Sequence, residues 1–261
     1  MKKLILIGAG KWGKNYVTTL HDFPSTNLII ANKENWKSLV DNGCDGVFIC
    51  TQPEYHIEIA RYVLQKNIPT MIEKPICFSS EEVNSLKEFS APILVNHIHL
   101  FSTAYQHLKF IIGNNISSIE SLGFNKGPER AYSSLWDYGS HDVAMILDLI
   151  GKFPNIINID NIKTKTGFLY FIEMKFDNIV TKSLVGNGGH SKIRKLKVNH
   201  NGLLSVYDDK LQSNIHDTPL HNAIQVFLQA INGKNDPRLG INLACQVTQI
   251  LETYHDLTNS K

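Results

Sequence analysis

Residues 2–13 of the chain read KKLILIGAGKWG, a short apolar run that leads directly into a Gly-x-Gly-x-x-Gly turn. Gly8 permits the tight turn, Gly10 lets the backbone approach a pyrophosphate, and Gly13 allows the following helix to pack closely on the strand. The N-terminus of that helix then faces an anion. Because a strand precedes the glycines and helical spacing follows them, we interpret the turn as a dinucleotide site. The alternative is a strand-to-helix turn that binds nothing.

The composition is that of an ordinary globular protein, with 261 residues, 43% of them hydrophobic, and a formal net charge of +2. No stretch concentrates Lys and Arg, so we expect small-molecule partners, with no nucleic acid and no membrane surface. No apolar run reaches the ~18 residues that span a bilayer, and no cleavable signal precedes the first strand, which predicts a cytoplasmic protein. The four cysteines form no Cys-x-x-Cys pair, which favours reduced thiols that serve in packing.

Strands and helices alternate over the first third of the chain. Continuous apolar runs such as residues 46–50 are typical of parallel strands that are covered on both faces. This alternation predicts an open parallel sheet with right-handed crossovers, a Rossmann-type NAD(P)-binding domain over residues 1–98. The later strands are expected at 28–31, 46–50, 70–72 and 92–96, and the helices between them at 35–40, 57–64 and 81–89, the last capped by Ser80.

The pattern changes near His97. From about residue 155 to residue 207 the chain is dominated by strands joined by turn signals such as Asn201-Gly202, which indicates antiparallel hairpins. The fold class is therefore α/β followed by α+β, the second domain, residues 99–261, combining helices with an open antiparallel sheet. Ligand is expected in the cleft between the two domains. Helices are expected at 105–112, 142–150, 219–231 and 242–257, and strands at 167–176, 179–185, 193–198 and 203–207.

Lys74 follows a predicted parallel strand, at the end where open α/β sheets place their ligands. Pro75 fixes the backbone beyond it. A lysine that is partly desolvated there, beside Glu73, can hold a proton for transfer or hydrogen-bond a substrate oxygen. A lone lysine is ordinarily a solvated surface charge, but the position at the end of a strand favours the functional interpretation.

A second group of polar residues lies in Trp136-Asp137-Tyr138-Gly139-Ser140-His141-Asp142, at the start of a predicted helix. Asp137 and His141 are four residues apart, so on a helix both face the same way. A carboxylate in the first helical turn is favoured by the helix dipole and can orient an imidazole or a substrate hydroxyl. The alternative makes Asp137 an N-cap and His141 a buried histidine with ordinary partners.

Together these features resemble the Gfo/Idh/MocA oxidoreductases, the group that includes glucose-fructose oxidoreductase and inositol 2-dehydrogenase. The likeness extends over nearly all the chain, although the region between Leu28 and Gly46 is short for the family, as if one crossover were trimmed or missing. The segments that carry the resemblance are Gly8 to Asn15, Thr51-Gln52-Pro53 with His56, Glu73-Lys74-Pro75, Trp136 to Asp142, and Pro219 to Ile224 with Phe227 and Ala230 to Gly233.

The resemblance implies that Lys74 and His141 handle protons and that Asp137 binds the substrate or orients the histidine. Which of the first two accepts the proton stays open. It also implies that His56 lies near the cofactor, although this residue could equally pack the helix that it begins. The expected cofactor-binding residues are Gly8, Gly10, Lys11, Trp12, Gly13, Asn32, Lys33, Thr51, Gln52, His56, Glu73 and Lys74.

The cofactor is expected to be NAD or NADP, with the preference open. The acidic residue that would bind the ribose hydroxyls of NAD is replaced by Asn32. Lys33 could pair with a 2'-phosphate and favour NADP, whereas Glu34 could bend back to a ribose and favour NAD.

Four further residues are expected to contact the substrate. Asn96 and His97 follow the last strand of the parallel sheet, and Arg130 could hold a phosphate or carboxylate, or be a solvated surface residue. A metal at His97 and His99 is conceivable, but no carboxylate or cysteine lies at ligand spacing nearby, so no metal is expected. The substrate-binding set is Asn96, His97, Arg130 and Tyr138.

These observations predict an NAD(P)-dependent oxidoreductase that transfers hydride to or from a hydroxyl or keto carbon of a sugar, cyclitol or nucleotide sugar. The alternative is a non-catalytic dinucleotide-binding regulator of the same fold. In the family that the chain resembles, one face of the second sheet often packs against another subunit, so a homodimer or larger homo-oligomer is expected in either case.

Overall fold

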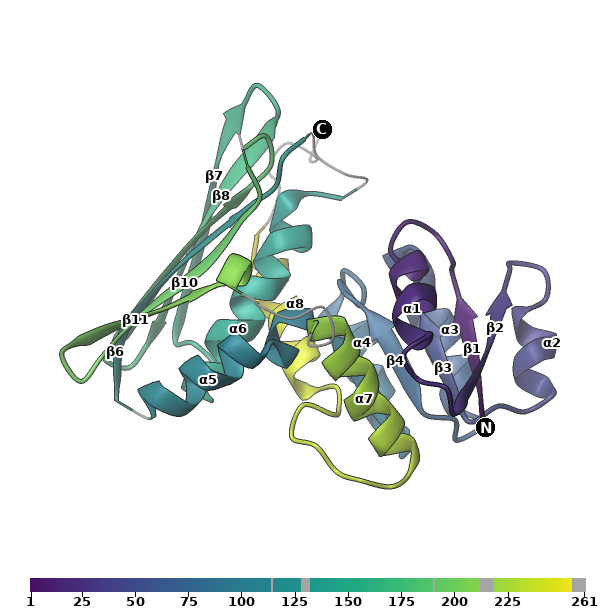
Figure 1. Cartoon of the computed structure of the whole chain (residues 1–261). Coiled ribbons are helices and arrows are strands. Elements are labelled where there is room, and N and C mark those ends of the chain that lie inside the picture. Colours follow the sequence, from purple (N-terminus) through teal and green to yellow (C-terminus); the bar gives the residue numbers. More distant parts are fainter. Residues whose placement is uncertain (114, 128–131, 190, 212–217, 255–261) are drawn as a thin grey trace. The chain divides into compact units, whose positions relative to one another are not determined.

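The chain divides into two compact units in the structure, a computed structural model (Figure 1). The first unit comprises Met1–Ile98 and His216–Cys245, and the second comprises His99–Ile215 and Gln246–Lys261. The sequence placed residues 216–245 in the second domain; they group with the first unit instead, because the helix within them packs on the first sheet. The structure describes residues 1–113, 115–127, 132–189, 191–211 and 218–254.

The first unit is built on a five-stranded parallel sheet in the order β2-β1-β3-β4-β5. Every residue of β3, β4 and β5 is buried, as is typical of parallel strands that are covered on both faces; β3 is wholly apolar, and β4 and β5 carry polar residues only at their ends, Thr70, Glu73 and Asn96. All five strands were expected, and their ends shift by no more than two residues. Their bounds are β1 (Lys2–Ile7), β2 (Thr26–Ala31), β3 (Gly46–Ile49), β4 (Thr70–Glu73) and β5 (Ile93–Asn96).

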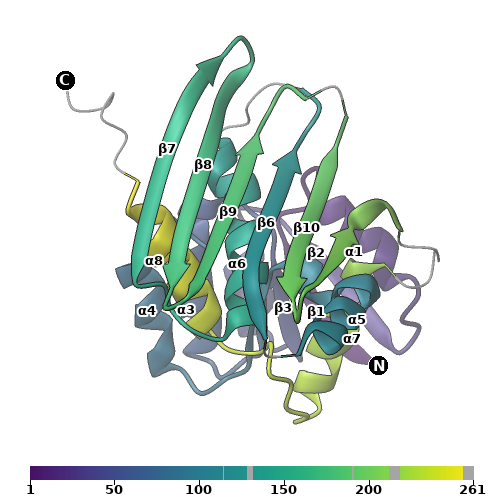
Figure 2. The same ribbon diagram turned by 90° about the vertical axis from the view of Figure 1, so that its left-hand side faces the viewer.

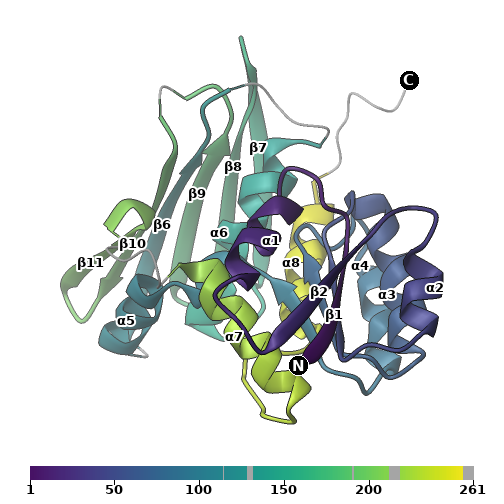
Figure 3. The ribbon, with the colours of Figure 1, turned by 45° about the vertical axis from the view of Figure 1, so that its right-hand side comes forward.

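Helices cover both faces of this sheet (Figure 3). On one face Phe48 of β3 contacts Tyr16 of α1 and Phe227 of α7, with ring centroids 5.4 and 5.1 Å apart. On the other face, α2, α3 and α4 close a core around Ile49 and Ile72. The helices are α1 (Gly13–Leu20), α2 (Trp36–Asp41), α3 (His56–Leu64), α4 (Ser80–Asn84) and α7 (Pro219–Ile231).

The helix α4 differs from the prediction at both ends. Its N-cap is Ser79, whose side chain accepts a hydrogen bond from the N–H of Glu82, and Ser80 is the first helical residue. The α-helix stops at Asn84 and continues as a 3₁₀ turn over Ser85–Glu88. The predicted helix 81–89 is therefore a short α-helix followed by a tighter turn.

The second unit contains a six-stranded sheet in the order β11-β10-β6-β9-β8-β7. It is mixed, because β6 pairs antiparallel with β10 but parallel with β9, whereas the sequence predicted antiparallel pairing throughout. The sequence also missed β6, whose residues ISSIESLGF are largely polar and small. The strands are β6 (Ile116–Phe124), β7 (Ile156–Thr164), β8 (Gly167–Phe176), β9 (Ile179–Gly186), β10 (Ile193–His200) and β11 (Leu203–Asp208).

Among the residues that the structure describes, helices cover one face of this second sheet, and Figure 2 looks onto the other face. The covering segments are α5 (Thr103–Ile112), a π-helical turn over Leu135–Gly139 and α6 (Ser140–Ile150). The last helix, α8 (Asn242–Glu252), ends earlier than the predicted residue 257. No helix in the described part of the chain is both long and apolar enough to cross a membrane. Exposed apolar side chains lie on the uncovered face: Ile156, Ile162, Phe171, Val180, Leu204 and Val206.

Candidate active site

The Gly-x-Gly-x-x-Gly turn joins β1 to α1, and its three glycines have different surroundings. Gly8 has a φ of +98°, and a Cβ there would lie 2.6 Å from the carbonyl carbon of Cys50. A Cβ on Gly13 would overlap the carbonyl oxygen of Gly8. Around Gly10, in contrast, no atom lies within 4 Å of the position a Cβ would take. The first and third glycines are thus required by packing, whereas the second leaves open space beside the start of α1, as a bound pyrophosphate needs.

Glu73, at the end of β4, connects three elements of the first unit. Its Oε1 accepts hydrogen bonds from the Tyr16 hydroxyl on α1 and from Nδ2 of Asn96 on β5, both at 2.6 Å. Its Oε2 accepts from the backbone N–H of Lys74 at 3.2 Å, and Trp12 also donates to the carboxylate. Burial raises the pKa of Glu73, while these donors and the Lys74 ammonium oppose the shift. The carboxylate therefore fixes the strand end that carries Lys74.

Lys74 follows β4 directly and is half-buried; the peptide bond to Pro75 is cis. The charge of its ammonium lowers the pKa of His97 as well as that of Glu73. Burial is the larger cause at His97, whose pKa falls to about 3, so this imidazole is neutral at physiological pH. The structure thus brings Lys74, Glu73 and His97 together at the carboxyl edge of the first sheet.

Several buried polar atoms at this edge have no hydrogen-bond partner among the described residues. They are Oγ1 of Thr51 after β3, Oδ1 of Asn96 at the end of β5, and both ring nitrogens of His97. Leaving a buried polar atom without a partner costs about 1–3 kcal/mol. Together with the space at Gly10, these atoms fit a nicotinamide dinucleotide, whose hydroxyl, amide and phosphate groups are hydrogen-bonding partners of the kind that they lack.

His56 is the first residue of α3 and is buried. Its Nδ1 lies 3.1 Å from the carbonyl oxygens of Pro75 and Ile76, and its Nε2 lies 3.0 Å from that of Thr51. Burial lowers its pKa, although the three carbonyls oppose the shift. This side chain connects the loops that follow β3 and β4, so it holds Thr51 and Pro75 in place. Gln52, beside it, is exposed.

The expected ribose end of the site follows β2. The side-chain oxygen of Asn32 accepts hydrogen bonds from the N–H groups of Glu34 and Asn35, at 3.0 and 2.9 Å. The backbone N–H of Asn32 donates in turn to Oδ1 of Asn35 at 2.8 Å. The hydrogen bonds of Asn32 therefore stabilise the turn before α2. Lys33 and Glu34 are both exposed at this point, as are Lys11 and Trp12 beside the glycine turn.

Asp137, Tyr138 and His141 belong to the second unit and are buried there. The first two lie in the π-helical turn and His141 lies in the first turn of α6, so the helix starts before residue 142, where the sequence predicted it. The His141 ring packs edge-on against His99, with centroids 4.8 Å apart. Nδ1 of His99 is in turn 2.9 Å from the Tyr207 hydroxyl. The imidazole of His141 thus packs in a cluster of rings with His99 and Tyr207, which the sequence did not predict.

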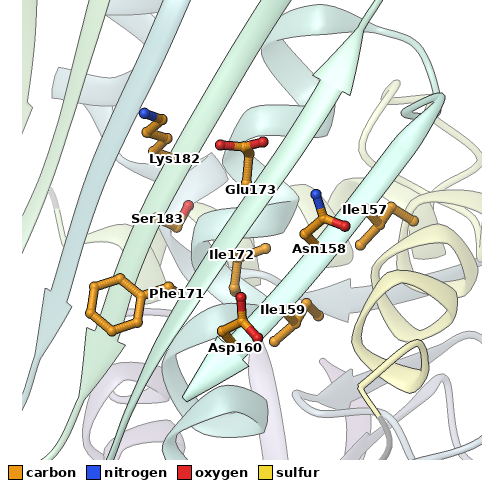
Figure 4. A pocket seen from close by; sticks show the side chains of 9 residues that line it. All are labelled: Ile157, Asn158, Ile159, Asp160, Phe171, Ile172, Glu173, Lys182 and Ser183. Atoms are coloured by element: carbon orange, nitrogen blue, oxygen red, sulfur yellow. The ribbon is translucent and has the colours of Figure 1, made fainter. Parts of the chain in front are cut away.

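Three features complete the survey of expected positions. Arg130 lies outside the described residues. Among the described residues, no group of three His, Cys, Asp or Glu side chains is placed to hold a metal ion. A shallow pocket on the uncovered face of the second sheet contains none of the expected site residues (Figure 4); its lining is Ile157, Asn158, Ile159, Asp160, Phe171, Ile172, Glu173, Lys182 and Ser183.

Sequence reasoning missed Arg194, and it included Asp142 in the segment 136–142 without identifying this residue as the buried partner of the arginine. A signal for the arginine exists, because strand alternation places Arg194 on the same face as Leu196 and Val198, which are buried. The acidic partner gives no comparable signal, since Asp142 lies at the start of a helix, where an exposed aspartate is ordinary.

Comparisons with known proteins agree with this architecture. Residues 24–91 match the Gfo/Idh/MocA family model, described as an oxidoreductase family with an NAD-binding Rossmann fold. No curated protein sequence matches the chain.

Solved structures match along almost the whole chain. A protein from Magnetospirillum magnetotacticum MS-1 that is described as an oxidoreductase superposes with a TM-score of 0.85 at 24% identity, covering 96% of this chain and 98% of that one. UDP-N-acetylglucosamine 3-dehydrogenase GnnA from Acidithiobacillus ferrooxidans gives 0.83 at 16%, covering 97% and 96%. Myo-inositol 2-dehydrogenase from Lactobacillus plantarum gives 0.81 at 15%, covering 96% and 95%. At these identities the likeness is one of fold.

Proposed function

We propose, from the match of residues 24–91 to the Gfo/Idh/MocA model of oxidoreductases with an NAD-binding Rossmann fold, that this chain is a member of that family and a dehydrogenase or reductase of CH–OH groups. Its substrate is a sugar, a cyclitol or a nucleotide sugar. Two of the similar structures are named as dehydrogenases of UDP-N-acetylglucosamine and of myo-inositol, which supports this substrate class. The nicotinamide, when bound, supplies the acceptor or donor of the hydride.

The observation that carries the proposal is the group of partnerless buried atoms on either side of Lys74. Thr51 follows β3 and Asn96 ends β5, and these two strands flank β4 in the sheet. A ligand at this edge would satisfy atoms that are otherwise costly to bury. The Lys74 ammonium, whose charge acts on His97 in the same region, can hydrogen-bond a hydroxyl or carbonyl oxygen of the substrate.

The protein's own residues would then manage the proton. In the oxidation direction, the hydroxyl proton of a secondary alcohol passes to the neutral amine of Lys74 or to the neutral imidazole of His141, and in reduction the protonated group returns it. Asp137 binds a substrate hydroxyl or orients the imidazole. Asn96, His97, Tyr138 and Arg130 are proposed substrate contacts.

The choice between NAD and NADP rests on the loop after β2. With Asn32 committed to its turn, the two exposed neighbours Lys33 and Glu34 are the side chains that can reach the 2' position of the ribose. A cation there favours a 2'-phosphate, and a carboxylate favours free hydroxyls. Paired titrations of Lys33→Ala and Glu34→Ala with NADH and NADPH measure the two contributions separately.

The decisive experiment combines binding with turnover. Fluorescence titration with NADH and NADPH establishes the cofactor, and a panel of sugars, cyclitols and nucleotide sugars then establishes turnover. We expect Lys74→Ala to lower kcat about a thousandfold with cofactor affinity little changed, because a positioned acid or base contributes 10²–10⁴-fold. The matched control is Lys87→Ala, an exposed lysine of the same unit. Turnover equal to wild type in Lys74→Ala would refute the assignment.

A second candidate function is a dinucleotide-binding regulator without catalysis. The observation that favours it is the ribose end, where the expected acidic residue is absent and Asn32 serves the backbone. Nicotinamide binding without hydride transfer across the whole panel would support this candidate. The presence of Lys74, Asp137 and His141 favours the enzyme, since a regulator has no need of proton-handling residues.

We also propose that the uncovered face of the second sheet joins two copies of the chain. A row of alternating charges crosses four neighbouring strands on this face, from Glu173 through Lys182 and Glu120 to Lys197. Figure 4 shows the first two side by side. The row on one side of it has the apolar residues Phe171, Leu184 and Leu122 at its centre, on β8, β9 and β6. We call the four charged residues the charge row.

The order of signs in the charge row suits a two-fold axis that runs parallel to the strands, between β9 and β6. Such an axis reverses the row, so that Lys182 faces Glu120 of the second copy and Glu173 faces Lys197 of the second copy. An axis perpendicular to the strands would instead oppose like charges. The face is thus self-complementary in one orientation, as a two-fold dimer requires.

A further inference from the structure

Arg194 is a buried cation in the interior of the second unit. It belongs to β10, and its side chain is 2% exposed and lies on the helix-covered face of the sheet. A buried charge is costly unless it is paired and hydrogen-bonded. The ion partner is Asp142 of α6, which is completely buried. Burial raises the pKa of Asp142, and the guanidinium opposes that shift as the largest counteracting cause.

The guanidinium also contacts the turn that precedes α6. Nη1 of Arg194 donates to the backbone oxygen of Tyr138 at 3.3 Å, and the guanidinium carbon lies 5.2 Å from the centre of the Tyr138 ring. The Asp142 carboxylate is held from a second strand, because Ser121 of β6 donates to its Oδ2 at 3.1 Å. The hydroxyl of Ser183 on β9 is 2.7 Å from that of Ser121. Three strands therefore converge on one helix start.

The sheet is shaped around this pair. A Cβ on Gly123 of β6 would lie 2.7 Å from Nη1 of Arg194 and 3.1 Å from Oδ2 of Asp142. The φ of Gly123 is not in the left-handed region, so backbone conformation does not require glycine at this position. The guanidinium and the carboxylate are what exclude a side chain.

The two contacts of Arg194 bracket the residues proposed to act on the substrate. Tyr138 directly follows Asp137, and Asp142 directly follows His141. Between them the chain changes from a π-helical turn to an α-helix, a geometry that is uncommon and needs support from its surroundings. We propose that Arg194 is a positioning residue, which with Asp142 fixes the turn that presents Asp137 and His141 to the substrate.

This inference rests on the proposed function for its catalytic consequence but not for its structural one. If Arg194 only stabilises the fold, an apolar pair of similar volume can replace it, since such replacements of buried ion pairs are often neutral or stabilising. If Arg194 positions the turn, the apolar pair restores stability without restoring the contact to the Tyr138 carbonyl. The double variant Arg194→Met/Asp142→Leu separates the two roles.

The test compares this double variant with Arg194→Met, Arg194→Lys and the control Lys109→Met, which removes a more exposed ion pair with Asp148 in the same unit. We expect Arg194→Met to lower Tm strongly, because Asp142 is left as an unpaired buried charge, and the double variant to recover most of that loss. We expect kcat in the double variant to stay at least tenfold below wild type, with the Kd for NADH unchanged, since a small misplacement of reacting groups is costly. Arg194→Lys should recover part of kcat.

A second readout does not depend on turnover. Hydrogen–deuterium exchange of the peptide that covers residues 135–142 should accelerate in the double variant, while peptides from α5 keep their protection. Exchange and kcat both equal to wild type in a double variant of normal Tm would overturn the inference. If the double variant does not fold, Arg194→Lys carries the same test, and unchanged exchange in residues 135–142 overturns the inference there. Absence of turnover in the wild type would count against the proposed function alone.

Discussion

Nδ2 of Asn96 donates a 2.6 Å hydrogen bond to Oε1 of Glu73, and so connects the ends of β5 and β4 through a buried charge. The same amide nitrogen is 2.9 Å from the Tyr16 hydroxyl, which donates to the same carboxylate oxygen. The anion stands beside the Lys74 ammonium, whose charge acts on it directly. The protonation behaviour of the lysine therefore depends on a group that need not touch the substrate.

Glu73→Gln should move the pH profile of kcat/KM towards lower pH. The carboxylate favours the charged form of the ammonium, so its removal makes the lysine easier to deprotonate. The measurement is kcat/KM against pH from 5 to 10, with the exposed Glu81→Gln as the control. A profile that coincides with wild type would show that Glu73 does not act on the lysine.

Gly10→Ala should weaken cofactor binding without destabilising the protein, whereas Gly13→Ala should destabilise the fold. A methyl group on Gly10 meets no atom of the protein, so Tm stays near wild type while the Kd for NADH rises about tenfold, because the methyl occupies the space of the pyrophosphate. On Gly13 the same methyl overlaps the Gly8 carbonyl, so Tm falls and binding is lost with the fold. Thermal melts and NADH titration of both variants decide the matter. Unchanged NADH affinity in a folded Gly10→Ala would place the cofactor elsewhere.

His97→Asn should reduce the amount by which the free energy of unfolding falls at acidic pH. The pKa of His97 is about 3 in the folded chain and near 6.5 when exposed, so below pH 6.5 the unfolded state takes up a proton that the folded state refuses. The free energy of unfolding therefore falls as pH drops from 6.5 towards 3, by up to about 1.4 kcal/mol per pH unit from this group.

Urea unfolding at pH 5 and pH 7 measures this effect. His107→Asn, which replaces an exposed histidine of α5, is the matched control for the loss of an imidazole. The prediction fails if the difference between the two pH values is as large in His97→Asn as in the wild type.

Lys182→Glu should weaken self-association at least tenfold, because the new carboxylate faces Glu120 of the second copy. The double variant Glu120→Lys/Lys182→Glu should restore it, since the two positions again carry opposite charges across the two-fold axis. Within one sheet, the double variant places the new glutamate at position 182 beside Glu173. Recovered association therefore cannot come from contacts inside one copy. Sedimentation at low and high salt measures association, with Lys87→Glu as the control. A double variant that dissociates like the single one would exclude the proposed axis.

The parallel sheet was predictable because its strands carry their own signal. β3 is a continuous apolar run and β4 has the apolar pair Met71-Ile72, and the rule that ligands lie at the carboxyl ends of parallel strands directs attention to Lys74. The strand β6 has no such signal, since serines, a glutamate and a glycine interrupt its apolar residues and leave neither a continuous apolar run nor a regular alternation. It is a strand because β9 and β10 supply hydrogen bonds on both sides, and pairing of that kind is not written in the segment itself.

The polar network of the candidate site shows the same limit. Glu73 is adjacent to Lys74 in the sequence, but its partners Tyr16 and Asn96 are 57 and 23 residues away. Local spacing identifies residues that stand at an element's end and gives no information on which distant side chains meet there. Arg194 was identifiable as a residue facing inward from its alternation with Leu196, yet its partner was not.

Because α7 belongs to the first unit but follows the second sheet in the sequence, the first unit can be completed only after the second sheet has been synthesised. Phe227 and Ile231 of this helix cover Gly46 and Phe48 of β3, and His221 lies 3.6 Å from Asp22 in the loop after α1. During translation, the five parallel strands are made first. The whole six-stranded sheet must then be synthesised before α7, the helix that covers one face of the parallel sheet, is complete. Until then, one apolar face of the parallel sheet is not covered by α7. A fragment that ends at residue 98 would keep this face exposed.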